Sequence, residues 1–217
     1  MSYGVLIKSS DGSVLLDEAY INYSLTNKLD FATYNGSLTA VTSMTDRAPI
    51  LAIHCEGKAG IVGCVFNGGY RTWYIAGSIA GQCTAYVFDR IVSTKTDTHG
   101  LHIYDVNGIL RVSSAEGYLG VVDIFETASY YQNNPVVNRT YAPGKYAVIL
   151  GTPRVNAHTS PYYADGITCT TSTIKIEMGV YVNTNSLPGY AWVSKAGNSV
   201  SQRTTYSNAM VIDVSGY

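Results

Sequence analysis

Charge is what this chain of 217 residues has least of. Only 13% of its residues are Asp, Glu, Lys or Arg, whereas about 25% is usual for soluble domains. Its 14 basic and 15 acidic residues give a formal net charge of −1, and the basic residues form no cluster. A run of phosphates needs clustered Lys and Arg for neutralisation. We therefore expect no nucleic-acid partner.

Long apolar segments are missing as well. No apolar run approaches the roughly 18 residues that suggest a membrane-spanning helix, so we expect no membrane partner. Residues 1–4 show neither the basic region nor the apolar region of a secretory signal peptide. We expect the protein to be made in a cytoplasm and not exported by its own sequence.

Cysteines are few and widely spaced. The four are Cys55, Cys64, Cys83 and Cys169, without the dense spacing of a disulfide-stabilised domain. Free cysteines are among the most buried residues, so the sequence favours four buried thiols. A disulfide between Cys55 and Cys64, which flank a turn at residues 57–60, is the alternative. The disulfide state therefore stays open.

Tyrosine is abundant, with 19 copies, and hydrophobic residues make up 46% of the chain. Tyr, Val, Ile and Thr suit the half-buried surface of a β-strand. Turn residues separate the apolar segments about every 8–12 residues, without a helical period. The sequence predicts an all-β fold in which two antiparallel sheets pack as a sandwich.

An internal repeat lies within this pattern. Residues 4–17 contain a short apolar strand, a turn ending in Gly12 and a second apolar strand. Residues 100–113 have the same arrangement with Gly108 in the turn, 96 residues later (108 − 12 = 96). Asp-Gly and Asn-Gly turns between apolar runs are strong hairpin signals.

The similarity extends to a third strand, which begins at Tyr20 in one copy and at Tyr118 in the other. We expect a sandwich built around a duplicated three-stranded hairpin unit, residues 4–25 and 100–125. The two copies either pack face to face or serve two neighbouring lobes.

The rest of the chain divides by composition. Residues 1–125 form the sandwich region, residues 126–144 form a loop or linker, and residues 145–217 form a C-terminal β region that can belong to the same domain. Residues 27–36 and 156–166 are expected to be loops. Further strands are expected at residues 38–44, 50–55, 61–66, 70–76, 83–89, 145–150, 173–183, 190–195 and 210–214, with 50–55 and 61–66 paired as a hairpin.

Catalytic patterns are not evident. His54 and Cys55 are neighbours in an expected strand, so their side chains point to opposite faces. A pairing of Cys64 or Cys83 with His102 or His158 stays open, but no family signature surrounds any of the cysteines. Metal-ligand clusters and phosphate-binding motifs are absent from the sequence. We expect no enzymatic activity, no metal and no cofactor.

Aromatic residues are the remaining candidates for binding. Trp73 and Trp192 lie in expected strands, where packing in the core is the favoured role. Exposed tyrosines in loops can stack on sugar rings or anchor a protein interface. The first strand can also add to the sheet edge of a partner. The candidate partner-binding residues are Tyr3, Val5, Ile7, Tyr130, Tyr131, Tyr162 and Tyr163.

One pattern combines a Gly-led strand, a turn ending in Gly and a Tyr-Leu-x-Val-Val-Asp strand. It is carried by residues 3–17, 86–89, 99–108 and 118–123. This combination resembles small uncharacterised proteins encoded in the tail modules of siphophages and prophages. The resemblance implies a structural virion protein at the distal tail, in the tail tip or baseplate or associated with the central fibre. It also implies no catalytic residues.

If the resemblance holds, the partners are other phage tail proteins, and we expect a homo-oligomer around the tail axis. The protein would be made in the host cytoplasm and would end in the virion. The alternative is a carbohydrate- or receptor-binding β-sandwich that uses the loop aromatics to contact a host-surface glycan.

Overall fold

A computed structural model of the chain describes a set of segments that are mostly strands. They are residues 6–8, 14–17, 23–43, 48–90, 102–104, 107–108, 110–113, 117–127, 136–151, 155–156, 162–182 and 208–217. Within these segments no helix is long and apolar enough to span a membrane.

Seventeen strands are present among the described residues. In chain order they are β1 (Leu6–Lys8), β2 (Val14–Asp17), β3 (Tyr23–Thr33), β4 (Leu38–Ser43), β5 (Ile50–Cys55), β6 (Lys58–Asn67), β7 (Tyr70–Ile79), β8 (Gly81–Arg90), β9 (His102–Tyr104), β10 (Leu110–Ser113), β11 (Val121–Glu126), β12 (Val137–Thr140), β13 (Tyr146–Leu150), β14 (Val155–Asn156), β15 (Tyr162–Cys169), β16 (Thr173–Val182) and β17 (Asn208–Asp213).

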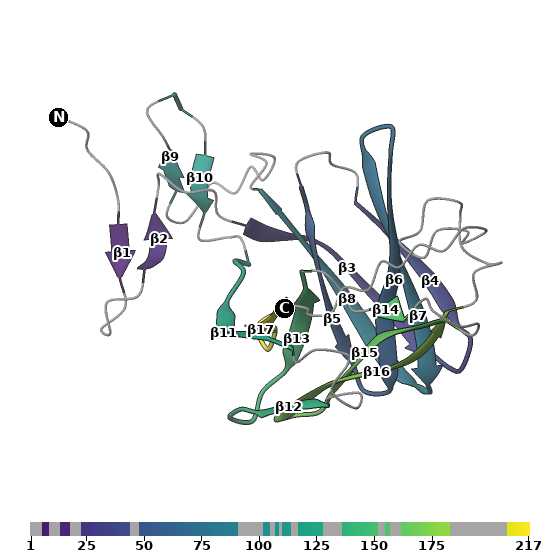
Figure 1. Cartoon of the computed structure of the whole chain (residues 1–217). Coiled ribbons are helices and arrows are strands. Elements are labelled where there is room, and N and C mark those ends of the chain that lie inside the picture. The colour runs from purple at the N-terminus through teal and green to yellow at the C-terminus, as the bar shows by residue number, and fades with distance from the viewer. Residues whose placement is uncertain are drawn as a thin grey trace.

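Two large antiparallel sheets form the body of the molecule (Figure 1). The six-stranded sheet has the order β11-β17-β13-β5-β8-β3. The seven-stranded sheet has the order β12-β16-β15-β6-β7-β4, with β14 paired to β15. The predicted all-β antiparallel sandwich is therefore confirmed.

The main core lies between the two sheets. Because successive side chains of a strand point to opposite faces, β5 directs Leu51 and Ile53 into this core and Ala52 to the other face. Trp73, on β7, is buried in the main core, as the sequence predicts.

A second core covers the outer face of the six-stranded sheet. Its buried members are Ala52, Tyr86, Phe88, Ala147, Ile149, Ile212 and Val214. The partly buried side chains of Leu119 and Tyr217 pack against this cluster, and the Tyr217 ring meets the Phe88 ring edge-on at 5.8 Å. Both faces of the central strands are therefore buried.

Residues 117–120, which lead into the edge strand β11, also contact the opposite edge strand, β3, at one end of the six-stranded sheet. The Leu25 amide donates to the Gly117 carbonyl at 2.8 Å, on β3. The Asp213 amide donates to the Gly120 carbonyl at 3.0 Å, at the end of β17. The sheet curls so that its first and last strands lie close together at this end.

The strand order shows that the duplication extends through the whole chain. Outward from the middle of the six-stranded sheet, the first half of the chain contributes β5-β8-β3 and the second contributes β13-β17-β11. The seven-stranded sheet repeats this with β6-β7-β4 and β15-β16-β12. Strands β1–β8 thus correspond in order to β9–β13 and β15–β17. The seam of the two halves runs between β5 and β13 and between β6 and β15, where equivalent strands pair antiparallel.

The side chains at the seam follow the same correspondence. Ile53 and Val148 both enter the main core, and Ala52 and Ala147 both enter the second core. Ile53 and Val148 are also direct partners across the β5–β13 pair. Strands β5 and β13, which hold the same place in the two halves, therefore meet directly at the seam.

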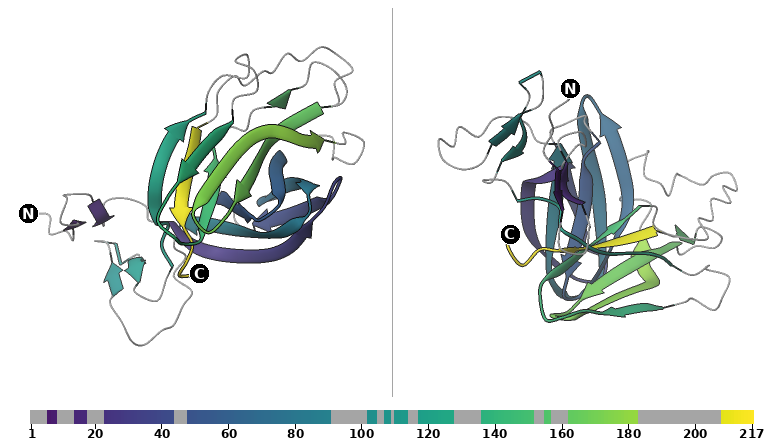
Figure 2. Two further views of the ribbon diagram at one scale, coloured as in Figure 1. Left: turned by 90° about the horizontal axis from the view of Figure 1, so that it is seen from below. Right: turned by 90° about the vertical axis from the view of Figure 1, so that its left-hand side faces the viewer.

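The first two strands of each repeat form separate two-stranded sheets, β1–β2 and β9–β10. Figures 1 and 2 show these hairpins beside each other at one side of the sandwich. The third strands meet through an antiparallel bridge between Ser24 and Tyr118. The hairpins predicted for both repeats are therefore present, outside the two large sheets.

The predicted hairpin of residues 50–55 with 61–66 is wrong. Strand β5 belongs to the six-stranded sheet and β6 to the seven-stranded sheet, so the chain crosses between sheets at Glu56 and Gly57. A Cβ on Gly57 would lie 2.8 Å from the carbonyl carbon of Ala80, where the chain crosses back between β7 and β8. Two crossings meet there, and only glycine fits.

Three predicted loops contain strands. Residues 27–36 include most of β3, residues 126–144 include β12, and residues 156–166 include the start of β15. Strands β3 and β12 lie at sheet edges, where polar side chains can face solvent while the backbone pairs on one side. Polarity therefore indicated edge position in these segments and not the absence of a strand.

Candidate functional site

A pocket of about 550 Å³ opens at the end of the sandwich where β5 ends, β13 begins and β15 turns into β16. It is lined by His54, Glu56, Gly144, Lys145, Cys169, Thr170 and Thr171. A pocket of this size with a few convergent polar groups is the usual form of a small-molecule site.

His54 contributes a defined hydrogen-bond acceptor to the pocket. Its Nδ1 lies 2.7 Å from the carbonyl oxygen of Tyr146. A carbonyl can only accept, so Nδ1 carries the hydrogen and Nε2 of the neutral ring is left as an acceptor. Burial lowers the pKa of His54, an effect larger than the opposing effects of the Tyr146 bond and of Glu56. The ring therefore stays neutral at pH 7.

Glu56 and Lys145 bring opposite charges to the same pocket. Both act electrostatically on His54, Glu56 favouring its charged form and Lys145 opposing it. Among the described residues the two side chains form no ion pair with each other. A bound ligand therefore has access to a carboxylate, an ammonium group and the His54 acceptor.

Cys169 is not a nucleophile in this pocket. Its side chain is buried, and burial raises the pKa of its thiol to about 12. Its Sγ lies 4.0 Å from the Ile53 carbonyl, a weak donor contact. Because the thiolate is the reactive form, the geometry of His54 and Cys169 does not constitute a catalytic pair.

The favoured prediction of four free thiols is wrong, because Cys55 and Cys83 form a disulfide. These residues are direct partners on β5 and β8, with Cα atoms 4.1 Å apart. The neighbouring Glu56 amide donates to the Gln82 carbonyl, so the cysteines occupy the close, non-hydrogen-bonded position of the ladder. The alternative partner, Cys64, is free and half-buried.

The sequence-predicted binding residues divide into two groups. Tyr3, Val5, Tyr130 and Tyr131 lie outside the described residues, as do His158 and Trp192. Ile7 lies in β1 opposite Leu16. Tyr162 and Tyr163 belong to β15 and not to a loop. Tyr163 is half-buried, and its backbone register partners are Asn156 of β14 and Tyr181 of β16.

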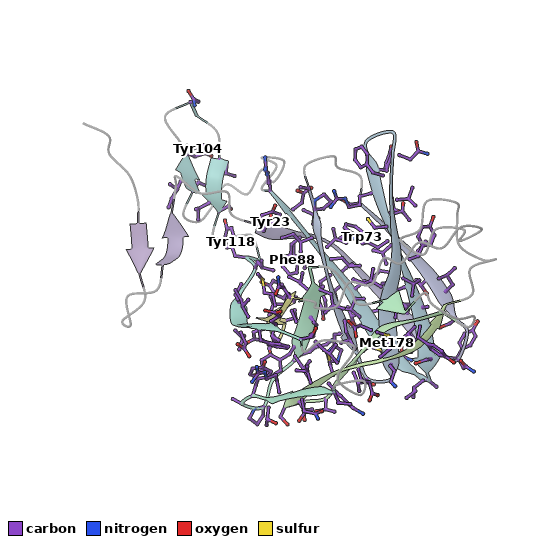
Figure 3. All side chains as sticks on the ribbon, viewed as in Figure 1. Tyr23, Trp73, Phe88, Tyr104, Tyr118 and Met178 are labelled. Carbon is purple, nitrogen blue, oxygen red and sulfur yellow. A yellow bond between two sulfur atoms is a disulfide. The ribbon has the colours of Figure 1, made fainter. Side chains whose placement is uncertain are left out.

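Tyr118 connects the β9–β10 hairpin to the sandwich. Its hydroxyl donates a hydrogen bond to the Ser113 carbonyl at 2.9 Å and accepts one from the Ser113 amide. Its own backbone faces Ser24 of β3, and its carbonyl accepts from the Tyr217 hydroxyl. Figure 3 shows Tyr118 beside Tyr23 on the side of the sandwich that faces the hairpins.

Strand β11 is an apolar sheet edge that the sequence analysis did not single out. Val121, Val122 and Ile124 are 48%, 45% and 64% exposed. Within the described part of the chain no strand pairs with the outer side of β11. The sequence indicates this edge by the apolar residues of Val121-Val122-Asp123-Ile124, which the sequence analysis assigns only to the repeat.

Groups of three or more potential metal ligands are not found among the described residues. No protein-family model, curated protein or solved structure matches the chain.

Proposed function

We propose that this protein is a structural component of a bacteriophage virion, at the distal tail, in the tail tip or baseplate or associated with the fibre. The support is the resemblance of residues 3–17, 99–108 and 118–123 to tail-module proteins, together with the way these segments are displayed. The first segment contains the β1–β2 hairpin, the second contains β9 of the equivalent hairpin, and the third leads into the exposed edge strand β11.

The observation that carries the proposal is the pair of equivalent hairpins outside both large sheets (Figure 2). An isolated two-stranded hairpin is only marginally stable in water. The β9–β10 hairpin buries Ile103, Leu110 and Val112 and leaves Tyr104 exposed. A neighbouring tail protein that pairs with β1 or covers Tyr104 would stabilise this lobe through main-chain hydrogen bonds and aromatic contact.

The proposed setting is a homo-oligomer around the tail axis in contact with other tail proteins. Synthesis would take place in the host cytoplasm and incorporation in the virion. A surface with few charges suits this setting, because few exposed charges hold neighbouring chains apart.

The test is incorporation into virions. Deletion of residues 1–17, and separately Tyr104→Asp on β9, should reduce the amount of protein in purified particles, whereas Phe66→Ala at the distant β6–β7 tip should not. Circular dichroism and thermal unfolding of each purified variant establish that the sandwich is folded. Normal incorporation of both hairpin variants would overturn the proposal.

Carbohydrate or receptor binding is the second candidate, and the pocket lined by His54, Glu56 and Lys145 favours it. Sugar hydroxyls would donate to the Glu56 carboxylate and to His54 Nε2, and Lys145 would donate to a ring oxygen or a carboxylate. A glycan array should show binding that Glu56→Gln and Lys145→Met remove and Tyr34→Ala retains. Binding that is lost only when Tyr130, Tyr131, Tyr162 and Tyr163 are changed to Ala would place recognition at the aromatics instead.

A further inference from the structure

We propose that β11 pairs with β11 of a second copy of this chain, so that the six-stranded sheets of two molecules form one continuous antiparallel sheet. The contact is isologous, with Ile124 of one copy facing Ile124 of the other on the twofold axis. The proposed function includes a homo-oligomer but assigns no contact to it; the β11 contact is new, and it does not depend on the tail function because it requires no other tail protein.

The first argument is the character of the β11 edge. A free sheet edge exposes a row of unpaired backbone groups, and natural proteins usually protect such edges with charges, prolines or covering segments. Ile124 is 64% exposed, beside Met210 of β17. Its exposure and that of Val122 leave an apolar edge that favours pairing. Figure 1 shows β11 at the margin of the sandwich.

The second argument is a comparison within the molecule. The equivalent edge in the first half is β3, which carries Lys28 and Asp30 on its exposed stretch. The contact between the two edges ends before β11, since the Leu119 amide donates to the Tyr23 carbonyl at 3.1 Å and β11 begins at Val121. The exposed stretch of β3 thus carries Lys28 and Asp30, whereas the most exposed side chain of β11 is the apolar Ile124, and no described strand pairs with the outer side of β11.

The third argument identifies the occupant as a second copy. The two halves of the chain already associate by antiparallel pairing of equivalent strands, with Ile53 facing Val148 at the seam. A β11–β11 contact repeats this arrangement between molecules, and a twofold contact of this kind is closed and self-complementary.

The pairing is also electrostatically consistent. With Ile124 facing its own copy, Asp123 faces Phe125 and Glu126 faces Val122 of the other molecule, so no like charges are directly opposed. The Asp123 carboxylate is already engaged, since it accepts from the Tyr141 hydroxyl at 2.9 Å and lies 4.0 Å from the Arg139 side chain.

Sedimentation of the full-length protein alone tests the proposal. The wild-type chain should form a concentration-dependent dimer. Ile124→Lys should weaken dimerisation at least about tenfold, because two like charges would face each other on the axis. Leu29→Lys, on the equivalent edge β3, is the matched control and should leave dimerisation unchanged. A chain that stays monomeric at about 0.1 mM would overturn the inference.

Cross-linking locates the contact. Directly opposed residues in an antiparallel pair have Cα atoms about 4.5–5.5 Å apart, within reach of a disulfide. In a Cys64→Ser background, oxidation of Ile124→Cys should give a covalent dimer and oxidation of Leu29→Cys should not. Equal cross-linking of both would show that the β11 contact is wrong. A variant that still dimerises but is no longer incorporated into virions would bear only on the proposed tail function and not on the β11 contact.

Discussion

Ile53 and Val148 face each other across the middle of the six-stranded sheet, and neither has any solvent exposure. One belongs to β5 and the other to β13, the equivalent strands of the two halves. The seam of the duplication is therefore inside the main core and not at a domain boundary. The two copies share one hydrophobic core, so each supplies part of the stability of the other.

This shared core predicts energetic coupling across the seam. Ile53→Ala should destabilise the protein by about 2–5 kcal/mol, through lost burial and a residual cavity. Val148→Ala should cost about 2 kcal/mol on the same grounds. The double variant should lose less than the sum in urea unfolding, because each substitution removes the same contact.

Leu29→Ala, on the exposed edge β3, is the control and should change the unfolding free energy by no more than about 0.5 kcal/mol. Strict additivity of the Ile53 and Val148 effects, within about 0.5 kcal/mol, would contradict a direct contact across the seam.

The sequence revealed the duplication only where turns mark it. Asp11-Gly12 and Asn107-Gly108 are recognisable because few residues tolerate the required backbone angles, and Gly108 has φ 75°. Similarity between the later strands is weaker, because core positions accept any apolar residue of suitable size. Connections also diverged, since Ala80 alone joins β7 to β8 whereas residues 183–207 separate β16 from β17.

Long-range strand pairing explains the other points at which the structure differs from the sequence-based predictions. A strand that crosses to the other sheet after Gly57 has the same local sequence pattern as a hairpin, so β5 and β6 were paired wrongly. The pocket shows the same limit. His54 and Glu56 are two residues apart, so their proximity follows from the sequence, but Lys145 and Thr170 come from distant parts of the chain. The Cys55–Cys83 disulfide was missed because it depends on the long-range pairing of β5 with β8.

The Tyr118 hydroxyl is predicted to hold the β9–β10 hairpin against the sandwich. Tyr118→Phe removes its bonds to the Ser113 amide and carbonyl, at a cost of about 1 kcal/mol per lost bond. Hydrogen exchange should become faster in β10 and stay unchanged in β5. Tyr104→Phe, on the exposed face of β9, is the matched control. Unchanged protection of β10 in Tyr118→Phe would show that the hairpin is held by other contacts.

His54 is predicted to make the protein sensitive to mild acid. Burial lowers its folded-state pKa below the usual value of 6.5. The unfolded chain then binds the proton more readily, so stability is complete above about pH 6.5 and declines as the pH falls toward the lowered pKa. His54→Gln should reduce the difference in urea midpoint between pH 7.5 and pH 5.5. An unchanged difference would assign the acid sensitivity to other groups.

The Cys55–Cys83 disulfide should be a major contributor to stability, because it closes a loop with a sequence separation of 28. Constraint of the unfolded chain by a loop of this length corresponds to about 3–4 kcal/mol. The Cys55→Ala/Cys83→Ala variant should therefore unfold at lower urea concentration, and Cys64→Ser should not. Alkylation under native, non-reducing conditions should modify the half-buried Cys64 and spare Cys169, whose pKa burial raises to about 12. Alkylation of Cys55 or Cys83 without a reductant would show that the disulfide does not form, and the stability difference should then vanish.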